Sequence, residues 1–263
     1  GGGRAGADDE AALDVARGLL GRVSRRRRAC RPSTVSTIRA SVTWRGNGPR
    51  MPPVRRRVIE VAGVLGVTPS LVLATCRDLG IAEPPESRAR HVIGLGLGDA
   101  LRHAVPDLPE QRYPQVIDRY RHHYLSRDHE LMLFAGAERM IAELSEAGFM
   151  LAVATGKSRL GLDRAFKMSG LGPYFHDSRC ADECHSKPHP QMLEELMSAF
   201  AVLPERTLMI GDTTHDLQMA KNAGVASLAV AYGAHPAESL DALEPLARLH
   251  DIEELREWFS RNA

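Results

Sequence analysis

The stretch Leu208-Met-Ile-Gly-Asp-Thr-Thr-His-Asp216 restricts the fold more than any other part of the sequence. Three apolar residues lead into Gly211 and Asp212, which is typical of a buried strand that carries a carboxylate at its C-terminal tip. Open α/β sheets bind their ligands at that edge. After Asp216 the sequence continues with helical spacing as far as Gly224, which can end a helix. A carboxylate at a strand tip suits a hard cation such as Mg²⁺. The simpler alternative is that Asp212 only caps the next helix.

Short apolar runs and helical patterns alternate along the second half of the chain. Such alternation predicts a parallel sheet with helices on both faces. In the first half, Pro69 opens a helix that ends near Gly80, and residues 84–85 are a proline break. We expect strands at 58–67, 149–154, 207–210 and 225–230, a short extended piece at 174–175, and helices at 137–147, 157–169, 190–201 and 246–259.

Three strand-end signals follow one another in this alternation. Thr155 and Gly156 follow an apolar run, where a hydroxyl and a backbone N–H can hold a phosphoryl oxygen. Lys187 lies between Ser186 and Pro188 before a helix, where its ammonium can offset phosphate charge. Asp212 adds a carboxylate for a metal. Each signal is weak by itself, but the three together predict a phosphate site at one edge of the sheet.

These segments resemble the second, third and fourth motifs of haloacid dehalogenase-superfamily phosphatases of the phosphoglycolate phosphatase type. The resemblance covers about residues 79–233 and rests on Ala154-Thr-Gly-Lys-Ser-Arg159, Ser186-Lys-Pro-His-Pro190 and Ile210-Gly-Asp-Thr-Thr-His-Asp216. It implies an α/β fold with a Rossmann-like core, a small inserted helical cap and an Mg²⁺-dependent aspartyl-phosphate mechanism. The implied substrate is a small phosphomonoester.

The resemblance also implies roles for particular residues. Thr155 and Gly156 would bind the phosphoryl group, and Lys187 would neutralise it. Asp212 would ligate Mg²⁺, with Asp216 as a further ligand or support. Residues 94–98, Gly-Leu-Gly-Leu-Gly, would face the active site from the cap.

The family's first motif is missing. That motif is an aspartate nucleophile, any residue, and an aspartate acid/base at the tip of the first strand, yet no Asp-x-Asp occurs in this chain. Counting back from Gly80 by the usual spacing places the two positions near Arg56 and Val58, and neither side chain can attack phosphorus or bind Mg²⁺. We therefore expect covalent turnover to be lost or very slow, which leaves a non-catalytic phosphate-binding or regulatory protein as an alternative. A replaced or out-of-frame N-terminal segment would explain the loss, and resequencing the gene tests that hypothesis.

Charge and composition divide the chain further. Residues 15–59 contain no acid and many arginines, so we expect 1–57 to be an Arg-rich, poorly ordered segment. Residues 58–83 would form the first strand and helix of the core, 84–131 the cap, and 132–263 the rest of the core. The arginines fit a solvated tail, a transit peptide or a nucleic-acid patch.

The remaining features of the sequence limit the classes of binding partner. A net charge of +1 selects neither nucleic acid nor membrane, no apolar run is long enough to span a bilayer, and four cysteines form no disulfide framework. We expect a cytoplasmic protein whose partner is a small phosphorylated metabolite. The sequence does not indicate the oligomeric state.

Other functional patterns are weaker. Residues 59–80 resemble a helix-turn-helix, which with the preceding arginines would make a DNA-binding fusion. A nucleotide-binding P-loop ending at Gly156-Lys157-Ser158 is excluded because Leu151 stands where its first glycine is required. Cys180, Cys184 and His185 form a poor zinc site, since no second ligand cluster accompanies them.

Overall fold

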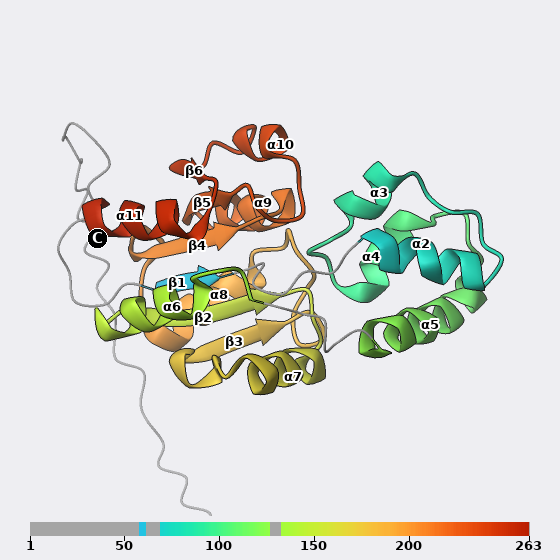
Figure 1. Ribbon diagram of the computed structural model, residues 1–263, viewed down its shortest axis with the longest axis horizontal. Helices are drawn as coiled ribbons and strands as arrows, with labels where there is room; N and C mark the ends of the chain where they lie inside the picture. Colours follow the sequence, from blue (N-terminus) through green and yellow to red (C-terminus); the bar gives the residue numbers. More distant parts are fainter. Residues whose placement is uncertain (1–57, 62–68, 127–132, 263) are drawn as a thin grey trace, which may run out of the picture. The chain divides into compact units, whose positions relative to one another are not determined.

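The computed structural model describes residues 58–61, 69–126 and 133–262, all within one compact unit, Gly48–Ala263. The expected N-terminal segment 1–57 lies outside the described residues. Six parallel strands form one sheet in the order β3-β2-β1-β4-β5-β6 (Figure 1). The strands are β1 (Val58–Val61), β2 (Met150–Thr155), β3 (Asp177–Cys180), β4 (Thr207–Gly211), β5 (Ala226–Val230) and β6 (Ala247–Leu249).

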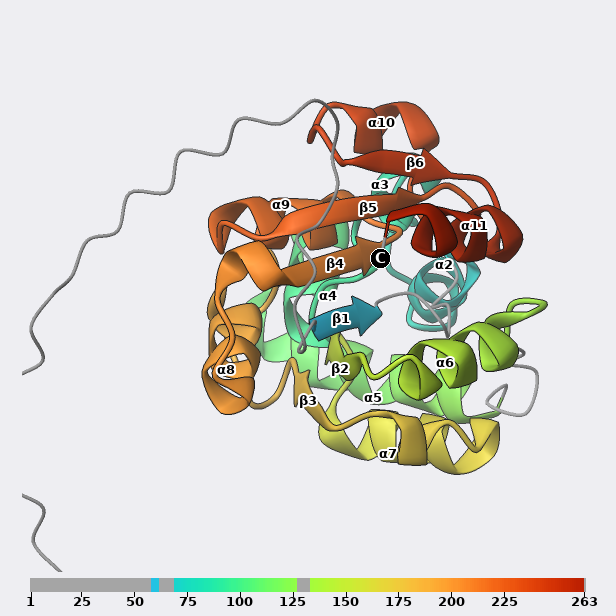
Figure 2. The ribbon, with the colours of Figure 1, turned by 90° about the vertical axis from the view of Figure 1, so that its left-hand side faces the viewer.

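Helices cover both faces of the sheet, as the alternation predicted (Figure 2). Helices α6 (Ala137–Glu146) and α11 (Ile252–Asn262) pack on one face, and α8 (Gln191–Phe200) and α9 (Thr214–Asn222) pack on the other. Strand β4 shows why both faces are apolar: Leu208 and Ile210 pack on the first side, and Met209 packs on the second. All five residues of β4 are buried, as expected for an inner parallel strand. The remaining core helices are α7 (Arg159–Ser169) and α10 (Ala237–Asp241), with 3₁₀ turns η3 (Gly172–Tyr174) and η4 (Pro204–Arg206).

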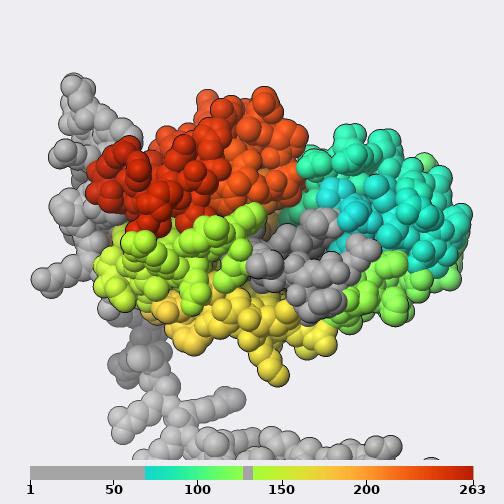
Figure 3. Space-filling view, in the orientation of Figure 1, coloured from blue at the N-terminus to red at the C-terminus, as the bar shows by residue number. Residues whose placement is uncertain are grey.

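A separate helical layer precedes the second strand. It consists of α2 (Pro69–Asp78), α3 (Glu86–His91), α4 (Leu97–Ala104), η1 (Glu110–Arg112) and α5 (Tyr113–Ser126). Apolar side chains from all four α-helices share one cluster, including Val72 of α2, Leu101 of α4 and Val116 of α5. Figure 3 shows this layer, coloured cyan to green, beside the sheet elements. We call α2–α5 the cap.

The structure changes three sequence-based expectations. Helix α2, which we assigned to the core with residues 58–83, packs against α3 and α5 of the cap. Of the extended piece expected at 174–175, Tyr174 belongs to η3 and Phe175 follows it with extended backbone, and the edge strand β3 begins at Asp177. The helix expected from 246 begins at Ile252, because 247–249 form β6. None of the helices in the described part of the chain has the length and apolar character needed to cross a bilayer.

Candidate active site

One cavity of about 460 Å³ lies between the cap and the carboxyl edge of the sheet. Every site residue predicted from the sequence lines it: Thr155, Gly156, Lys187, Asp212 and Asp216. They come from the end of β2, the loop before α8, and the junction of β4 with α9. The cap contributes residues 94–98 to the lining, which matches the position expected for the Gly-Leu-Gly-Leu-Gly segment. Parallel strands explain the convergence, because their C-terminal ends all meet at this edge.

Lys187 is held by a buried ion pair. Its ammonium donates to Asp216 Oδ1 at 2.6 Å and to the backbone oxygen of Ala154 at 2.8 Å. The Lys187 and Asp216 side chains are only 2% and 1% exposed. A buried charge needs a partner and hydrogen bonds, and Asp216 with Ala154 supplies both. The ammonium is therefore fixed at the cavity wall.

Asp216 is also the anchor of α9. Thr213 is the N-cap residue of this helix, and the Thr213 hydroxyl and backbone N–H both approach Asp216 Oδ2, at 2.7 and 3.1 Å. This reciprocal capping box satisfies N–H groups that the first helical turn leaves unpaired. The cap of α9 is thus Thr213, and the interpretation of Asp212 as a mere helix cap is wrong. Both Asp216 oxygens already accept from protein donors.

Asp212 is a buried carboxylate that faces the cavity. It is 7% exposed, and its Oδ2 accepts from the Ala234 N–H at 2.8 Å. Burial, and then the negative charge of Asp216, raise the pKa of Asp212 to about 6. A Cβ at Gly233 would lie 2.1 Å from Asp212 Cβ, so only glycine allows this loop to reach the carboxylate. Residues 233–234 carry no recognisable sequence signal, because their role depends on that approach.

Further contacts tie the cap to the rim of the cavity. The Lys157 ammonium donates to the Tyr124 hydroxyl at 2.7 Å, and it also lies 4.8 Å from the centre of that ring. The Gly96 N–H donates to Ser186 Oγ at 2.9 Å. Thr155 Oγ1 accepts from the Lys157 N–H at 3.2 Å, which orients the hydroxyl at the end of β2.

Gly156 marks the closest approach of the two layers. A Cβ on this residue would lie 2.4 Å from Leu95 O and 2.6 Å from Gly94 O. We expect Gly156→Ala to displace the cap segment and to lower the free energy of unfolding by about 1–3 kcal/mol, the usual cost of overpacking. Gly161→Ala in α7 is the matched control, since its Cβ would meet only ordinary contacts at 3.4 Å or more. Urea unfolding of the two variants tests this: equal stabilities would contradict the tight approach.

The register of strand β1 tests two hypotheses made from the sequence, the position of the missing first motif and the helix-turn-helix. Val58 is the first residue of β1 and pairs with Thr207, at the end of the strand away from the cavity. Counting back to Val58 for the missing motif was therefore wrong. Arg56 lies outside the described residues, and so do residues 62–68, which follow β1 in the chain and contain no Asp or Glu. The helix-turn-helix is wrong in its first part, because 59–61 belong to a strand paired on both sides.

Cys180, Cys184 and His185, which we considered a poor zinc site, are not grouped as metal ligands in the part of the chain that the structure describes. Cys180 packs with Val153 and Leu162, and the His185 ring contacts Gln191 Oε1. Within the described ranges, the side chains grouped closely enough to hold a metal ion are instead His91, His215 and His235. His215 donates from Nε2 to the backbone oxygen of His91 at 2.7 Å.

Comparison with known proteins agrees with this geometry. A model of the haloacid dehalogenase-like hydrolases matches residues 69–230, a range that contains Thr155, Lys187 and Asp212. The chain belongs to the haloacid dehalogenase-like hydrolase family. It is 34% identical over 200 residues to a probable phosphatase, IndB, of Dickeya dadantii, covering 72% of this chain and 86% of that protein.

Other similar proteins are also phosphatases by name. A phosphoglycolate phosphatase of Vibrio vulnificus is 30% identical over 207 residues, which cover 72% of this chain and 91% of the relative. A solved structure described as a predicted phosphoglycolate phosphatase from Haemophilus somnus superposes with a TM-score of 0.68 at 20% identity, covering 78% of this chain and 97% of that one. That structural likeness supports the Rossmann-like α/β fold of this family member.

Proposed function

We propose that the cavity binds the phosphoryl group of a small phosphomonoester together with Mg²⁺. The observation that carries the proposal is the convergence of the Thr155 hydroxyl, the Lys187 ammonium and the Asp212 carboxylate on one cavity. A fixed ammonium attracts the phosphoryl oxygens, and a hydroxyl at a strand end can donate to one of them. A volume of about 460 Å³ is in the range of small-molecule sites. The phosphatases among the relatives support a phosphorylated metabolite as the ligand.

The residues present fit Mg²⁺. Asp212 offers a hard oxygen ligand, and a cation beside it would offset the cost of its buried negative charge, which is what raises its pKa. Asp216 has both oxygens engaged by Lys187 and Thr213, so we assign it the role of positioning Lys187. When bound, Mg²⁺ would supply positive charge toward the phosphoryl oxygens.

Turnover needs one more group. In the family reaction a carboxylate oxygen attacks phosphorus, the alcohol departs, and water then cleaves the aspartyl phosphate. This chain has no Asp-x-Asp, and residues 62–68 after β1 contain no carboxylate. We propose that the chain retains ligand binding at a phosphatase-type site and does not form the aspartyl phosphate.

Titration calorimetry with phosphoglycolate and Mg²⁺, together with a p-nitrophenyl phosphate assay, tests both parts. We expect measurable binding and no Mg²⁺-dependent hydrolysis. Thr155→Val should weaken phosphoglycolate binding by roughly 10–100-fold, because a hydrogen bond to a charged group contributes about 1.5–3 kcal/mol.

Thr207→Val is the matched control for Thr155→Val. It makes the same change at the opposite end of the sheet, where Thr207 Oγ1 donates to Leu203 O at 3.1 Å. Equal weakening by both variants would contradict the role of Thr155. Hydrolysis by the purified chain that disappears in Asp212→Asn would show that a nucleophile is present, and would overturn the second part of the proposal.

A further inference from the structure

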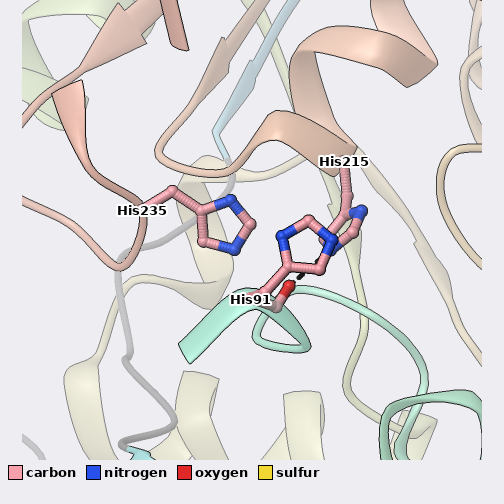
Figure 4. Close-up of side chains that lie close together, drawn as sticks. All are labelled: His91, His215 and His235. Atoms are coloured by element: carbon pink, nitrogen blue, oxygen red, sulfur yellow. Dashed lines mark hydrogen bonds between the residues drawn. The ribbon is translucent and has the colours of Figure 1, made fainter. Parts of the chain in front are cut away.

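Three histidines from distant parts of the chain meet beside the cavity (Figure 4). His91 ends α3 of the cap, His215 lies in the first turn of α9, and His235 lies in the segment between β5 and α10. One ring nitrogen from each lies within 4.8 Å of the others. The centre of the His91 ring lies 4.9 Å from the centre of the His215 ring and 5.4 Å from that of the His235 ring. None of the three lines the cavity that contains Asp212.

His215 is oriented as a metal-binding histidine usually is. Its Nε2 donates to the backbone oxygen of His91 at 2.7 Å, and because a carbonyl can only accept, the proton must be on Nε2. The lone pair is then on Nδ1. Ligating histidines almost always donate their other ring N–H to a carbonyl or carboxylate, which fixes the tautomer and the ring plane.

His235 carries an unsatisfied buried nitrogen. The residue is 4% exposed, and its Nε2 is the single buried side-chain polar atom without a hydrogen-bond partner among the described residues. Nδ1 lies 3.0 Å from the Thr214 N–H and 3.1 Å from the Thr214 hydroxyl. A buried polar atom with no partner costs about 1–3 kcal/mol, so a ligand at Nε2 would remove that cost.

Burial disfavours the charged form of two of these imidazoles. Burial, followed by the neighbouring imidazoles of His215 and His91, lowers the pKa of His235 to about 4. Burial also lowers the pKa of His215.

We propose that His91, His215 and His235 together bind a divalent transition-metal ion of the zinc type. Three imidazoles suit Zn²⁺, Ni²⁺ or Cu²⁺ rather than Mg²⁺, which takes oxygen ligands. Zinc–nitrogen distances of about 2.0–2.1 Å place ligand nitrogens about 3.4 Å apart, so the rings need to close by about 1–1.5 Å. His235 Nδ1 accepts from the Thr214 N–H, so binding the metal through Nε2 would require the ring proton to move to Nδ1, which would then donate to the Thr214 hydroxyl in place of accepting from the N–H. The ion would link α3 of the cap to α9 of the core.

The test uses the full chain, with Zn²⁺ as the probe and excess Mg²⁺ present to occupy carboxylate sites. We expect zinc to bind with a stoichiometry of one and to raise the melting temperature. His91→Ala should weaken zinc binding at least ~10-fold, since even a residue that only orients a ligand changes affinity about 10–100-fold. His91 is exposed, so we expect its removal to leave the fold intact. Co²⁺ in place of zinc should give the visible absorption of a nitrogen-rich site, and His91→Ala should lose it.

Two control variants distinguish the three-histidine site from a second histidine pair and from the carboxylate in the cavity. His189 stacks on His185 with ring centres 4.4 Å apart, so His189→Ala removes an imidazole from that pair and should leave zinc binding unchanged. Asp212→Asn should also leave it unchanged. Equal zinc affinity in the wild type and His91→Ala, or a loss in Asp212→Asn alone, would overturn the proposal. These measurements involve no phosphate, so they do not depend on the proposed function.

Discussion

Lys187→Met should lower the free energy of unfolding by about 3–5 kcal/mol at pH 7.5, because it removes one partner of a buried ion pair. Asp216 is 1% exposed, and its Oδ1 would lose the ammonium 2.6 Å away. Methionine keeps the unbranched shape of the lysine chain, so lost packing contributes little. The remaining effect is the cost of an uncompensated carboxylate inside the protein. Urea unfolding followed by circular dichroism measures it.

Two further variants isolate that cause. Lys221→Met breaks an exposed pair with Glu244, whose atoms are 3.2 Å apart and whose side chains are 54% and 81% exposed, and it should change stability by less than about 1 kcal/mol. Lys187→Met combined with Asp216→Asn removes the uncompensated charge while an amide oxygen can still accept from Thr213. We expect this double variant to recover most of the loss. A double variant as unstable as Lys187→Met would show that charge is not the cause.

The inner strands of the sheet were predictable because burial on both faces leaves an apolar run. Strand β4 is buried at every position, and β2 is nearly so. The edge strands were not predicted, because they are short and only partly buried. Strand β3 reads Asp-Ser-Arg-Cys and β6 reads Ala-Arg-Leu, and such short polar segments give no periodic signal. Helix α2 was found within a residue or two, but its packing against α5 depends on tertiary contacts.

The same distinction between local sequence signals and tertiary contacts applies to the site residues. Thr155, Lys187 and Asp212 follow directly from strand ends and loop positions, so their meeting at one edge could be expected from topology. The contact of Ala234 with Asp212, and that of Tyr124 with Lys157, require a loop and a helix to approach from elsewhere. The three histidines share no sequence motif, and His91 reaches the others only because the cap packs on the core.

Asp212→Asn should have opposite effects on stability and on ligand binding. A pKa raised from 3.8 to about 6 means that folding favours the protonated carboxyl. The stability that Asp212 contributes is therefore fully present below about pH 4, and it is lost as the pH rises through 6. This change in pKa corresponds to about 3 kcal/mol as an upper value. The amide cannot ionise, and its oxygen can still accept from the Ala234 N–H.

We therefore expect Asp212→Asn to be more stable than the wild type by up to about 3 kcal/mol at pH 7.5. The difference should vanish near pH 3.5. Urea unfolding at both pH values measures it, with Asp118→Asn as the control, since the Asp118 side chain is 78% exposed. Mg²⁺ should stabilise the wild type at pH 7.5 and leave Asp212→Asn unchanged, because ligand binding to the folded state adds to stability. Equal stabilisation of both proteins by Mg²⁺ would place the cation elsewhere. A gain that persists at pH 3.5 would mean that packing, rather than the buried charge, limits stability at this position.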